Sequence, residues 1–192
     1  MALSLGCEYL ARAALAQPQA WRRLALISPT GLGGRRFDGP SGQARGSARV
    51  HRVLANPRWA PWLFAQLTRP GVIRYFLNKT WGSPQIDEDL WHYDTLTTRV
   101  GGARHAPLYF LSGQLFAADI SRVYDGLPQP VWVAHGTRGD FTDYRGLPPR
   151  VQASGGRWQQ AVFEGGAMPH FEHQAAFLQR WVAWQEAQHP LN

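Results

Sequence analysis

The stretch ALSLGCEYLARAA, residues 2–14, decides the fold. Small and apolar residues flank Ser4, and the alanine-rich run that begins at Cys7 is typical of a helix. Such a pattern predicts a sharp strand-to-helix turn whose central residue has a strained backbone conformation. Gly6 suits this turn, and Ala2 stands where the pattern prefers glycine, a difference of one methyl group. The turn places the Ser4 hydroxyl at a helix N-terminus, where free amides and the positive dipole end favour a developing anion.

A candidate carboxylate follows a later strand. The apolar run PVWVAHG, residues 130–136, ends in glycine and predicts a buried parallel strand. Residues 137–141 then form the loop at the carboxyl end of that strand, which makes Asp140 the candidate acid. Asp143 lies on the same loop, further from the strand end, and is the rival acid.

A candidate base follows the last predicted strand. Residues 157–163 predict that strand, and the glycine-rich residues 164–170 deliver His170 just before a helix. His173 is the rival base, but we expect it inside the helix, whereas His170 lies on the loop. A serine, an acid and a histidine in this order, each at the end of a predicted strand, support one another as a triad.

Four stretches together resemble the second half of an α/β-hydrolase-fold serine hydrolase with a helical cap: LSLGCEYLARAA, LALISPTGL, PVWVAHGTRGDFTDYRG and GGAMPHFEHQAAFL. The resemblance implies that Ser4 is the nucleophile, His170 the general base and Asp140 the carboxylate that orients the imidazole. The backbone N–H of Leu5 is the expected oxyanion-hole donor. The predicted fold class is therefore α/β, a partial α/β-hydrolase fold made of the last parallel strands and helices with an inserted helical cap.

The position of Ser4 leads us to expect an incomplete fold. In α/β-hydrolases the serine turn follows about five strands, and the second oxyanion donor comes from an early loop. We therefore expect the chain to be N-terminally truncated, with a bare sheet edge, poor solubility and little esterase activity when it is expressed from Met1. The alternative to an active serine hydrolase is a truncated or non-catalytic fragment that lacks the first strands and part of the oxyanion hole.

The chain divides into a core and an excursion. A strand over residues 24–28 continues the core, residues 35–52 are polar and read as a flexible linker, and residues 57–126 have helical patterns. Pro70 and Asp87 are expected to begin helices in this excursion. The predicted domains are residues 1–34 and 127–192 as the incomplete core, and 35–126 as linker plus helical cap.

The expected pocket lies at the carboxyl ends of the strands, beneath the cap. Ser28, Pro29 and Thr30 follow a core strand beside the serine turn and are predicted to line it. Most cap aromatics are expected to form the cap's own core, while Trp62 and Phe76 are predicted to contact substrate. An apolar pocket suits a small apolar acyl or ester substrate. Lyases, acyltransferases and cofactor-free oxidative enzymes on the same scaffold are further alternatives.

Composition argues against several kinds of site and partner. The net charge of +7 comes from scattered arginines, which we interpret as solvated side chains rather than a nucleic-acid surface. Cys7 is the only cysteine, so no intrachain disulfide is possible. No apolar run is long enough to cross a membrane, and a cytoplasmic location is the default expectation. We predict no metal and no cofactor, because the remaining histidines show no metal-ligand spacing: His51, His92, His105 and His189. The sequence predicts no oligomeric state.

Three further side chains receive structural interpretations. His135, with apolar neighbours on its strand, is expected to be a hydrogen-bonded core histidine. Glu172, in the first turn of the last helix, is expected to complement the helix dipole. Cys7 is expected to pack against the sheet.

Overall fold

The core is a parallel four-stranded sheet in the order β1-β2-β3-β4. The computed structural model describes residues 1–188. The strands are β1 (Ala2–Leu3), β2 (Leu24–Ile27), β3 (Val131–Gly136) and β4 (Trp158–Phe163). The apolar runs that predicted the last three strands are confirmed. The α/β class and the parallel sheet that the sequence predicts are therefore present.

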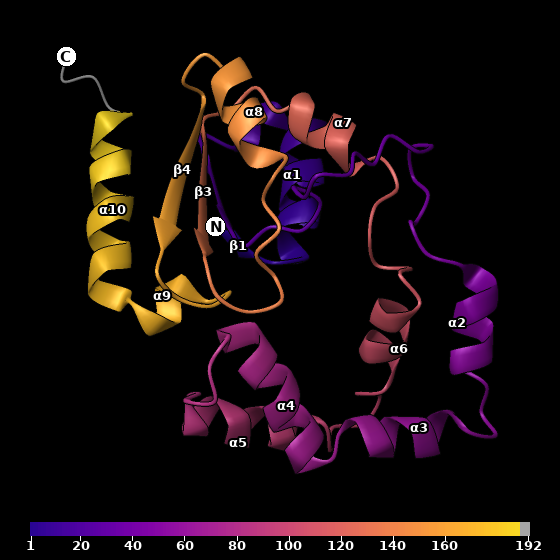
Figure 1. Cartoon of the computed structure of the whole chain (residues 1–192). Helices are drawn as coiled ribbons and strands as arrows, with labels where there is room; N and C mark the ends of the chain where they lie inside the picture. Colours follow the sequence, from indigo (N-terminus) through magenta and orange to yellow (C-terminus); the bar gives the residue numbers. More distant parts are fainter. Residues whose placement is uncertain (189–192) are drawn as a thin grey trace.

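Helices cover both faces of the sheet, because alternate residues of each buried strand point to opposite sides. Leu24 and Leu26 pack on the face covered by α1 (Gly6–Ala16), α7 (Ile120–Asp125) and α8 (Leu147–Ala153). Ala25 and Ile27 pack on the opposite face, against Phe177 and Trp184 of α10 (Gln174–Ala187). Figure 1 shows α10 alone on one side of the sheet. Two short helical turns, η1 (Pro18–Ala20) and α9 (Pro169–Glu172), complete the core.

The excursion between β2 and β3 is helical, as predicted, and lies toward the carboxyl ends of the strands (Figure 1). Its helices are α2 (Ala48–Leu54), α3 (Ala60–Leu67), α4 (Pro70–Trp81), α5 (Glu88–Thr97) and α6 (His105–Leu111). The predicted helix starts at Pro70 and Asp87 are confirmed, and the Asp87 carboxylate accepts a hydrogen bond from the Leu90 amide at 2.7 Å. The cap has its own apolar cluster, in which α4 and α5 meet.

Two features of the excursion differ from the sequence expectation. Helix α2 begins inside the stretch 35–52 that was predicted to be a flexible linker, and its N-cap is Ser47. Helix α7 lies before residue 127, yet its Ile120 and Tyr124 are fully buried in the core beside α1. The packing boundary between cap and core therefore lies before α7, because α7 covers the same face of the sheet as α1.

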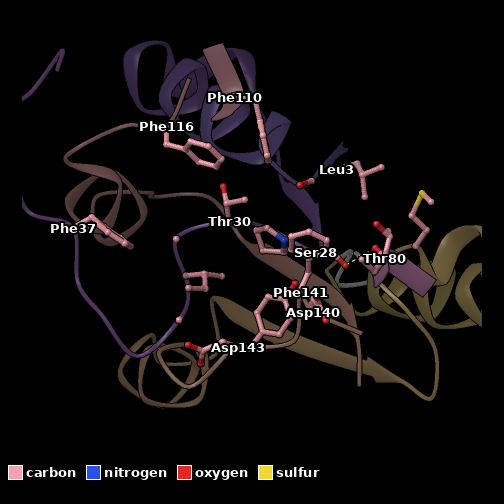
Figure 2. A pocket seen from close by; sticks show the side chains of 18 of the residues that line it. Leu3, Ser28, Thr30, Phe37, Thr80, Phe110, Phe116, Asp140, Phe141 and Asp143 are labelled. Carbon is pink, nitrogen blue, oxygen red and sulfur yellow. Dashed lines mark hydrogen bonds between the residues drawn. The ribbon is translucent and has the colours of Figure 1, made fainter. Parts of the chain in front are cut away.

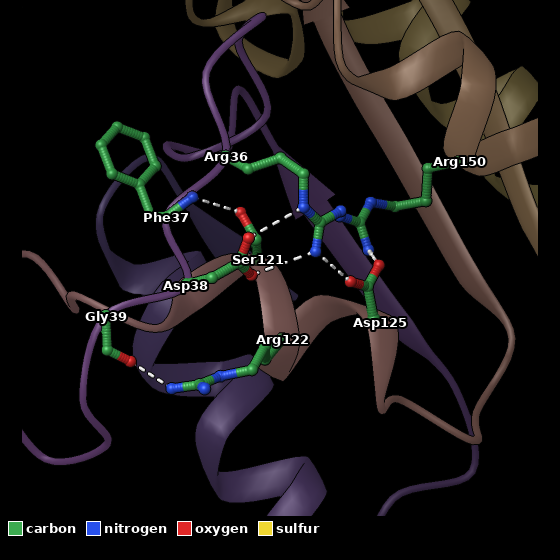
Figure 3. Close-up of polar contacts among 8 residues, drawn as sticks. All are labelled: Arg36, Phe37, Asp38, Gly39, Ser121, Arg122, Asp125 and Arg150. Atoms are coloured by element: carbon green, nitrogen blue, oxygen red, sulfur yellow. Dashed lines mark hydrogen bonds and ion pairs between the residues drawn. The ribbon is translucent and has the colours of Figure 1, made fainter.

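A polar network ties the start of the excursion to the core (Figure 3). The Arg36 guanidinium binds the Asp38 carboxylate at 2.9 Å and the Asp125 carboxylate of α7 at 2.7 Å. The backbone N–H of Phe37 donates to the Ser121 hydroxyl at 2.8 Å. Arg150 of α8 pairs with the other oxygen of Asp125. Exposed ion pairs contribute little one by one, but together they fix where the chain leaves the core, and so where Phe37 lies.

Cys7 lies fully buried under the sheet, as predicted, with its Sγ 3.2 Å from the Ala2 carbonyl oxygen. Burial raises the pKa of this thiol to about 12. We therefore expect no measurable reaction with Ellman's reagent at pH 8 in the folded chain and one reactive thiol after denaturation, because only the thiolate is nucleophilic. Rapid titration of one thiol in the native protein would contradict this burial.

Candidate functional site

The turn after β1 has the strained geometry that the sequence predicts. Ser4 has a φ of +50°, which side chains other than glycine rarely adopt, and its amide donates to the Ile27 carbonyl at 2.8 Å. A Cβ added at Gly6 would lie 3.8 Å from the Ala2 Cβ, an ordinary contact. The turn therefore accommodates alanine at position 2. Ser4 is exposed, and the Leu5 amide has no hydrogen-bond acceptor within residues 1–188.

A cavity of about 540 Å³ opens beside Ser4 at the carboxyl ends of the strands (Figure 2). Its floor comes from the loops after all four strands, and the excursion supplies its remaining walls. The floor residues are Leu3, Ser4, Ser28, Pro29, Thr30, Gly31, Leu32, Gly33, Asp140, Phe141, Asp143, Tyr144, Ala167 and Met168. The wall residues are Phe37, Arg45, Thr80, Phe110 and Phe116. The size and the largely apolar lining suit a small organic ligand.

Five of the predicted site residues meet in this cavity: Ser4, Ser28, Pro29, Thr30 and Asp140. Ser28 repeats the strain of Ser4, with a φ of +44°. Its hydroxyl donates to the Ala167 carbonyl at 2.6 Å, which joins the loops after β2 and β4. The loops that follow the strands therefore meet at one pocket, as the sequence predicts.

Trp62 and Phe76 do not line the cavity. Their side chains are 66% and 51% exposed on cap helices α3 and α4. The aromatic lining comes instead from Phe37, Phe110 and Phe116, together with Phe141 of the core. The cap carries aromatic side chains on several helices and on several faces of each, and only the tertiary packing decides which of them meet the pocket.

His170 is also absent from the residues that line the cavity. It lies on α9, with its ring centroid 5.9 Å from that of Phe177. Its Nδ1 is buried without a hydrogen-bond partner within residues 1–188, and no hydrogen bond joins it to Ser4 or Asp140. Burial lowers the pKa of His170, which favours the neutral imidazole. The rival His173 has its Nε2 3.3 Å from the Glu164 carbonyl oxygen. The expected placement of the two histidines is wrong: His170 lies within α9, and His173 lies between α9 and α10, because the last helix begins only at Gln174.

The two candidate acids both line the cavity, but each has a cationic partner. The Asp140 carboxylate lies 3.5 Å from Lys79 Nζ, and its backbone amide donates to the Lys79 carbonyl at 3.1 Å. The Asp143 carboxylate binds the Arg145 guanidinium at 2.8 and 3.0 Å. Those hydrogen bonds hold the pKa of Asp143 well below its usual range.

The carboxyl end of α4 holds the loops after β3 and β4 together. The Lys79 carbonyl accepts the Asp140 amide, and the Thr80 carbonyl accepts the Ala167 amide at 2.9 Å. Glycines allow this close approach: a Cβ at Gly82 would lie 2.3 Å from the Gly139 amide nitrogen, and one at Gly166 would lie 2.5 Å from the Thr80 oxygen. The last carbonyls of a helix lack partners within it, and here they position the two loops that carry the candidate acid and base.

Two other polar residues have structural roles. His135 is buried as predicted, with Nδ1 2.9 Å from the Gly136 carbonyl oxygen and Nε2 2.7 Å from the Gln160 amide nitrogen. Glu172 accepts hydrogen bonds from the Gly166 amide and the Arg138 guanidinium, both at 2.7 Å. Glu172 thus holds the β4 loop in place. It is the last residue of α9 and lies before α10, not in the first turn of the last helix as the sequence suggested.

Glu8 and Arg45 form a buried ion pair that the sequence pattern did not indicate. Glu8 lies one turn after the serine turn, and Arg45 lies in the stretch that was interpreted as linker. Arg45 lines the cavity, and Thr30 donates to the Glu8 carboxylate at 2.6 Å. No sequence signal marks this pair, because its members are far apart in the chain and one arginine among many looks solvated.

No side-chain group in residues 1–188 has the three or more His, Cys, Asp or Glu residues that would hold a metal ion. Within the same residues, no helix is both long and apolar enough to cross a membrane. His189, one of the histidines considered in the sequence, lies outside the described residues.

Comparison with known proteins finds matches only at the level of structure. No family profile matches the sequence, and no curated protein matches it either. A serine hydrolase from Cycloclasticus zankles, 12% identical, superposes with a TM-score of 0.62 over 98% of this chain and 64% of its own. The 2-hydroxy-6-oxo-6-phenylhexa-2,4-dienoate hydrolase of a Rhodococcus strain, 14% identical, superposes with a TM-score of 0.63 over 94% of this chain and 61% of its own. A putative lipase from Acinetobacter baumannii, 16% identical, superposes with a TM-score of 0.64 over 97% of this chain and 59% of its own.

These structures are α/β-hydrolases, and at such low identity the likeness concerns the fold alone. The chain spans about three fifths of the length of each, and nearly all of its own residues take part in the match. The chain therefore has the α/β-hydrolase fold over the part of that fold which it spans.

Proposed function

We propose that this chain carries the acyl-binding site of a serine hydrolase, in which Ser4 attacks the carbonyl carbon of a small apolar ester. The observation that carries the proposal is the strained, exposed Ser4 beside a cavity of about 540 Å³. A strained backbone at a functional position is commonly part of the mechanism. The unpaired Leu5 amide then donates to the oxyanion of the tetrahedral intermediate.

In the proposed mechanism, His170 accepts the Ser4 proton and returns it to the leaving alcohol, while Asp140 orients the imidazole. The result is an acyl-enzyme at Ser4 Oγ, which water hydrolyses with the same histidine as base. The order of the three residues along the chain supports this assignment. It requires the His170 imidazole to approach Ser4 and the Asp140 carboxylate to leave Lys79, because the structure joins none of them by a hydrogen bond.

The test is covalent capture of the nucleophile. The full chain would be incubated with p-nitrophenyl butyrate and, separately, with a fluorophosphonate, and the modified peptide would be located by mass spectrometry. We expect one butyryl or phosphonyl group on Ser4. Modification of another residue, or none under conditions that label a known serine esterase, would contradict the proposal.

Two histidine variants test the base. In a protein that completes the fold, His170→Ala is expected to lower ester turnover as severely as loss of Ser4, because the two groups act as a unit. His173→Ala is expected to have a mild effect and serves as the matched control, since it lies on the same segment. The measurement is kcat/KM for p-nitrophenyl butyrate, with thermal unfolding to confirm that both variants fold. The reverse ranking would assign the base to His173, and Asp140→Asn against Asp143→Asn tests the acid in the same way.

A second candidate function is non-catalytic ligand binding in the same cavity. The specific observation in its favour is that no histidine lines the cavity in the described part of the chain. Without a base, Ser4 would bind or slowly trap acyl groups without turning them over. Binding of an ester analogue with no release of product in a prolonged assay would favour this alternative.

A further inference from the structure

Arg45 is a fixed part of the cavity wall. Its backbone amide donates to the Phe116 carbonyl at 2.7 Å, and its neighbour Ala44 forms an antiparallel bridge with Ala117. The Arg45 side chain is only 19% exposed. Because the backbone is held on both sides and the side chain is largely buried, the guanidinium has a defined position at the cavity.

Two aromatic rings and one carboxylate surround the guanidinium. Its central carbon lies 4.1 Å from the Phe37 ring centroid and 5.0 Å from that of Phe116. Its Nη2 donates to the buried Glu8 carboxylate. Aromatic faces attract a cation, so the wall presents a flat charged group between two rings. Figure 2 shows Phe37 and Phe116 on the same side of the cavity as Thr30.

The guanidinium has donors left over. Arg45 Nε is buried without a hydrogen-bond partner, and Nη1 has no partner within residues 1–188. A buried donor without an acceptor costs free energy. Glu8 does not supply the missing acceptors: its two oxygens bond to Arg45 Nη2, to the Thr30 hydroxyl at 2.6 Å and to the Ala117 amide at 2.7 Å, and neither bonds to Nε or Nη1.

The other carboxylates at the cavity do not compensate Arg45. Asp140 pairs with Lys79, and Asp143 pairs with Arg145. The Glu8 carboxylate neutralises the charge of Arg45 and also accepts hydrogen bonds from two neutral donors, the Thr30 hydroxyl and the Ala117 amide. The cavity wall therefore presents an ion-paired guanidinium whose hydrogen bonds are incompletely satisfied, next to apolar rings.

We propose that Arg45 binds a carboxylate of the ligand, and that the preferred ligands of this cavity are acyl compounds carrying both a planar apolar group and a free carboxylate. The carboxylate accepts hydrogen bonds from the unused Nη1 of Arg45, because hydrogen bonds between charged groups are about twice as strong as those between neutral ones. The planar group packs against the apolar side chains of Phe110, Phe116 and Phe141 that line the rest of the cavity. This inference rests on the proposed function for the choice of an acyl compound, and it adds the class of substrate.

The experiment compares matched ligands that differ only in charge. Binding of 3-phenylpropanoate and of its neutral primary amide to the full chain would be measured by calorimetry at pH 7.5. We expect the acid to bind roughly tenfold more tightly than the amide, the scale of one good charge-assisted hydrogen bond. Equal affinities, or no detectable binding of the acid, would overturn the proposal.

Two variants test the role of Arg45 itself. Arg45→Lys keeps a cation for Glu8 but removes the planar guanidinium, and the double variant Glu8→Gln with Arg45→Gln removes both charges together. Each is expected to lower the preference for the acid to threefold or less, provided that it unfolds cooperatively. Arg49→Gln, at an exposed position on α2, is the matched control and is expected to keep the wild-type preference. An unchanged preference in a folded Arg45 variant, or an equal loss in the control, would overturn the assignment.

The outcome is independent of the serine chemistry. Labelling of Ser4 by a neutral p-nitrophenyl ester tests the proposed function, and the acid-to-amide ratio tests Arg45 without any turnover. Labelled Ser4 with no preference for the acid would overturn the inference alone. Preference for the acid without labelling would support Arg45 as the ligand anchor and remove the hydrolase mechanism.

Discussion

In a protein that completes the fold, Ser4→Ala is expected to abolish ester turnover, with a loss on the order of a millionfold. The alanine cannot form the acyl-enzyme, and relief of the strain at φ +50° does not restore a nucleophile. The measurement is kcat/KM for p-nitrophenyl butyrate, together with intact mass after incubation with the ester. The variant is expected to keep the wild-type mass and to unfold at a similar temperature.

Ser28→Ala is the informative comparison, because Ser28 is also a strained serine at a strand end and lines the same cavity. It loses the hydrogen bond to the Ala167 carbonyl, so a moderate fall in rate is expected, but acylation of Ser4 is expected to persist. Full activity in Ser4→Ala, or loss of acylation only in Ser28→Ala, would contradict Ser4 as the nucleophile.

Gly136→Ala is expected to give a large loss of stability for a single added methyl group. Its Cβ would lie 2.0 Å from the Gly166 carbonyl oxygen and 2.2 Å from that of Gly165. Both obstacles are backbone atoms of the β4 loop, which the end of α4 holds in place, so no side-chain rotation relieves the clash. Overpacking of this kind costs roughly 3 kcal/mol, which corresponds to a fall of roughly 6–12 °C in Tm for a chain of this size.

Gly71→Ala is the control for this prediction. Gly71 lies in the first turn of α4 and has no heavy atom within 4 Å of an added Cβ. Alanine there is expected to be neutral or slightly stabilising, by up to about 1 kcal/mol, because it reduces the freedom of the unfolded chain. Thermal unfolding of the two variants gives the comparison, and equal Tm values would show that the contact between the β3 and β4 loops is not rigid.

The sequence by itself determined the features that depend on local patterns. The apolar runs ended by glycine predicted β2, β3 and β4, and Pro70 and Asp87 marked the starts of α4 and α5. The small residues around Ser4 predicted the strained turn. These features depend on backbone conformation and on burial over a few neighbouring residues, and both are written in a short stretch of sequence.

Only the tertiary structure decided which side chains meet in the cavity. Phe37, Phe110 and Phe116 line it, whereas the predicted Trp62 and Phe76 are exposed and His170 lies outside its lining. The pairing of Glu8 with Arg45 and the glycine contacts at the end of α4 join segments that are far apart in the chain. Such contacts depend on the relative placement of whole elements, because each helix could present several of its faces to the sheet. A pattern within one element does not encode which face its distant partner will cover.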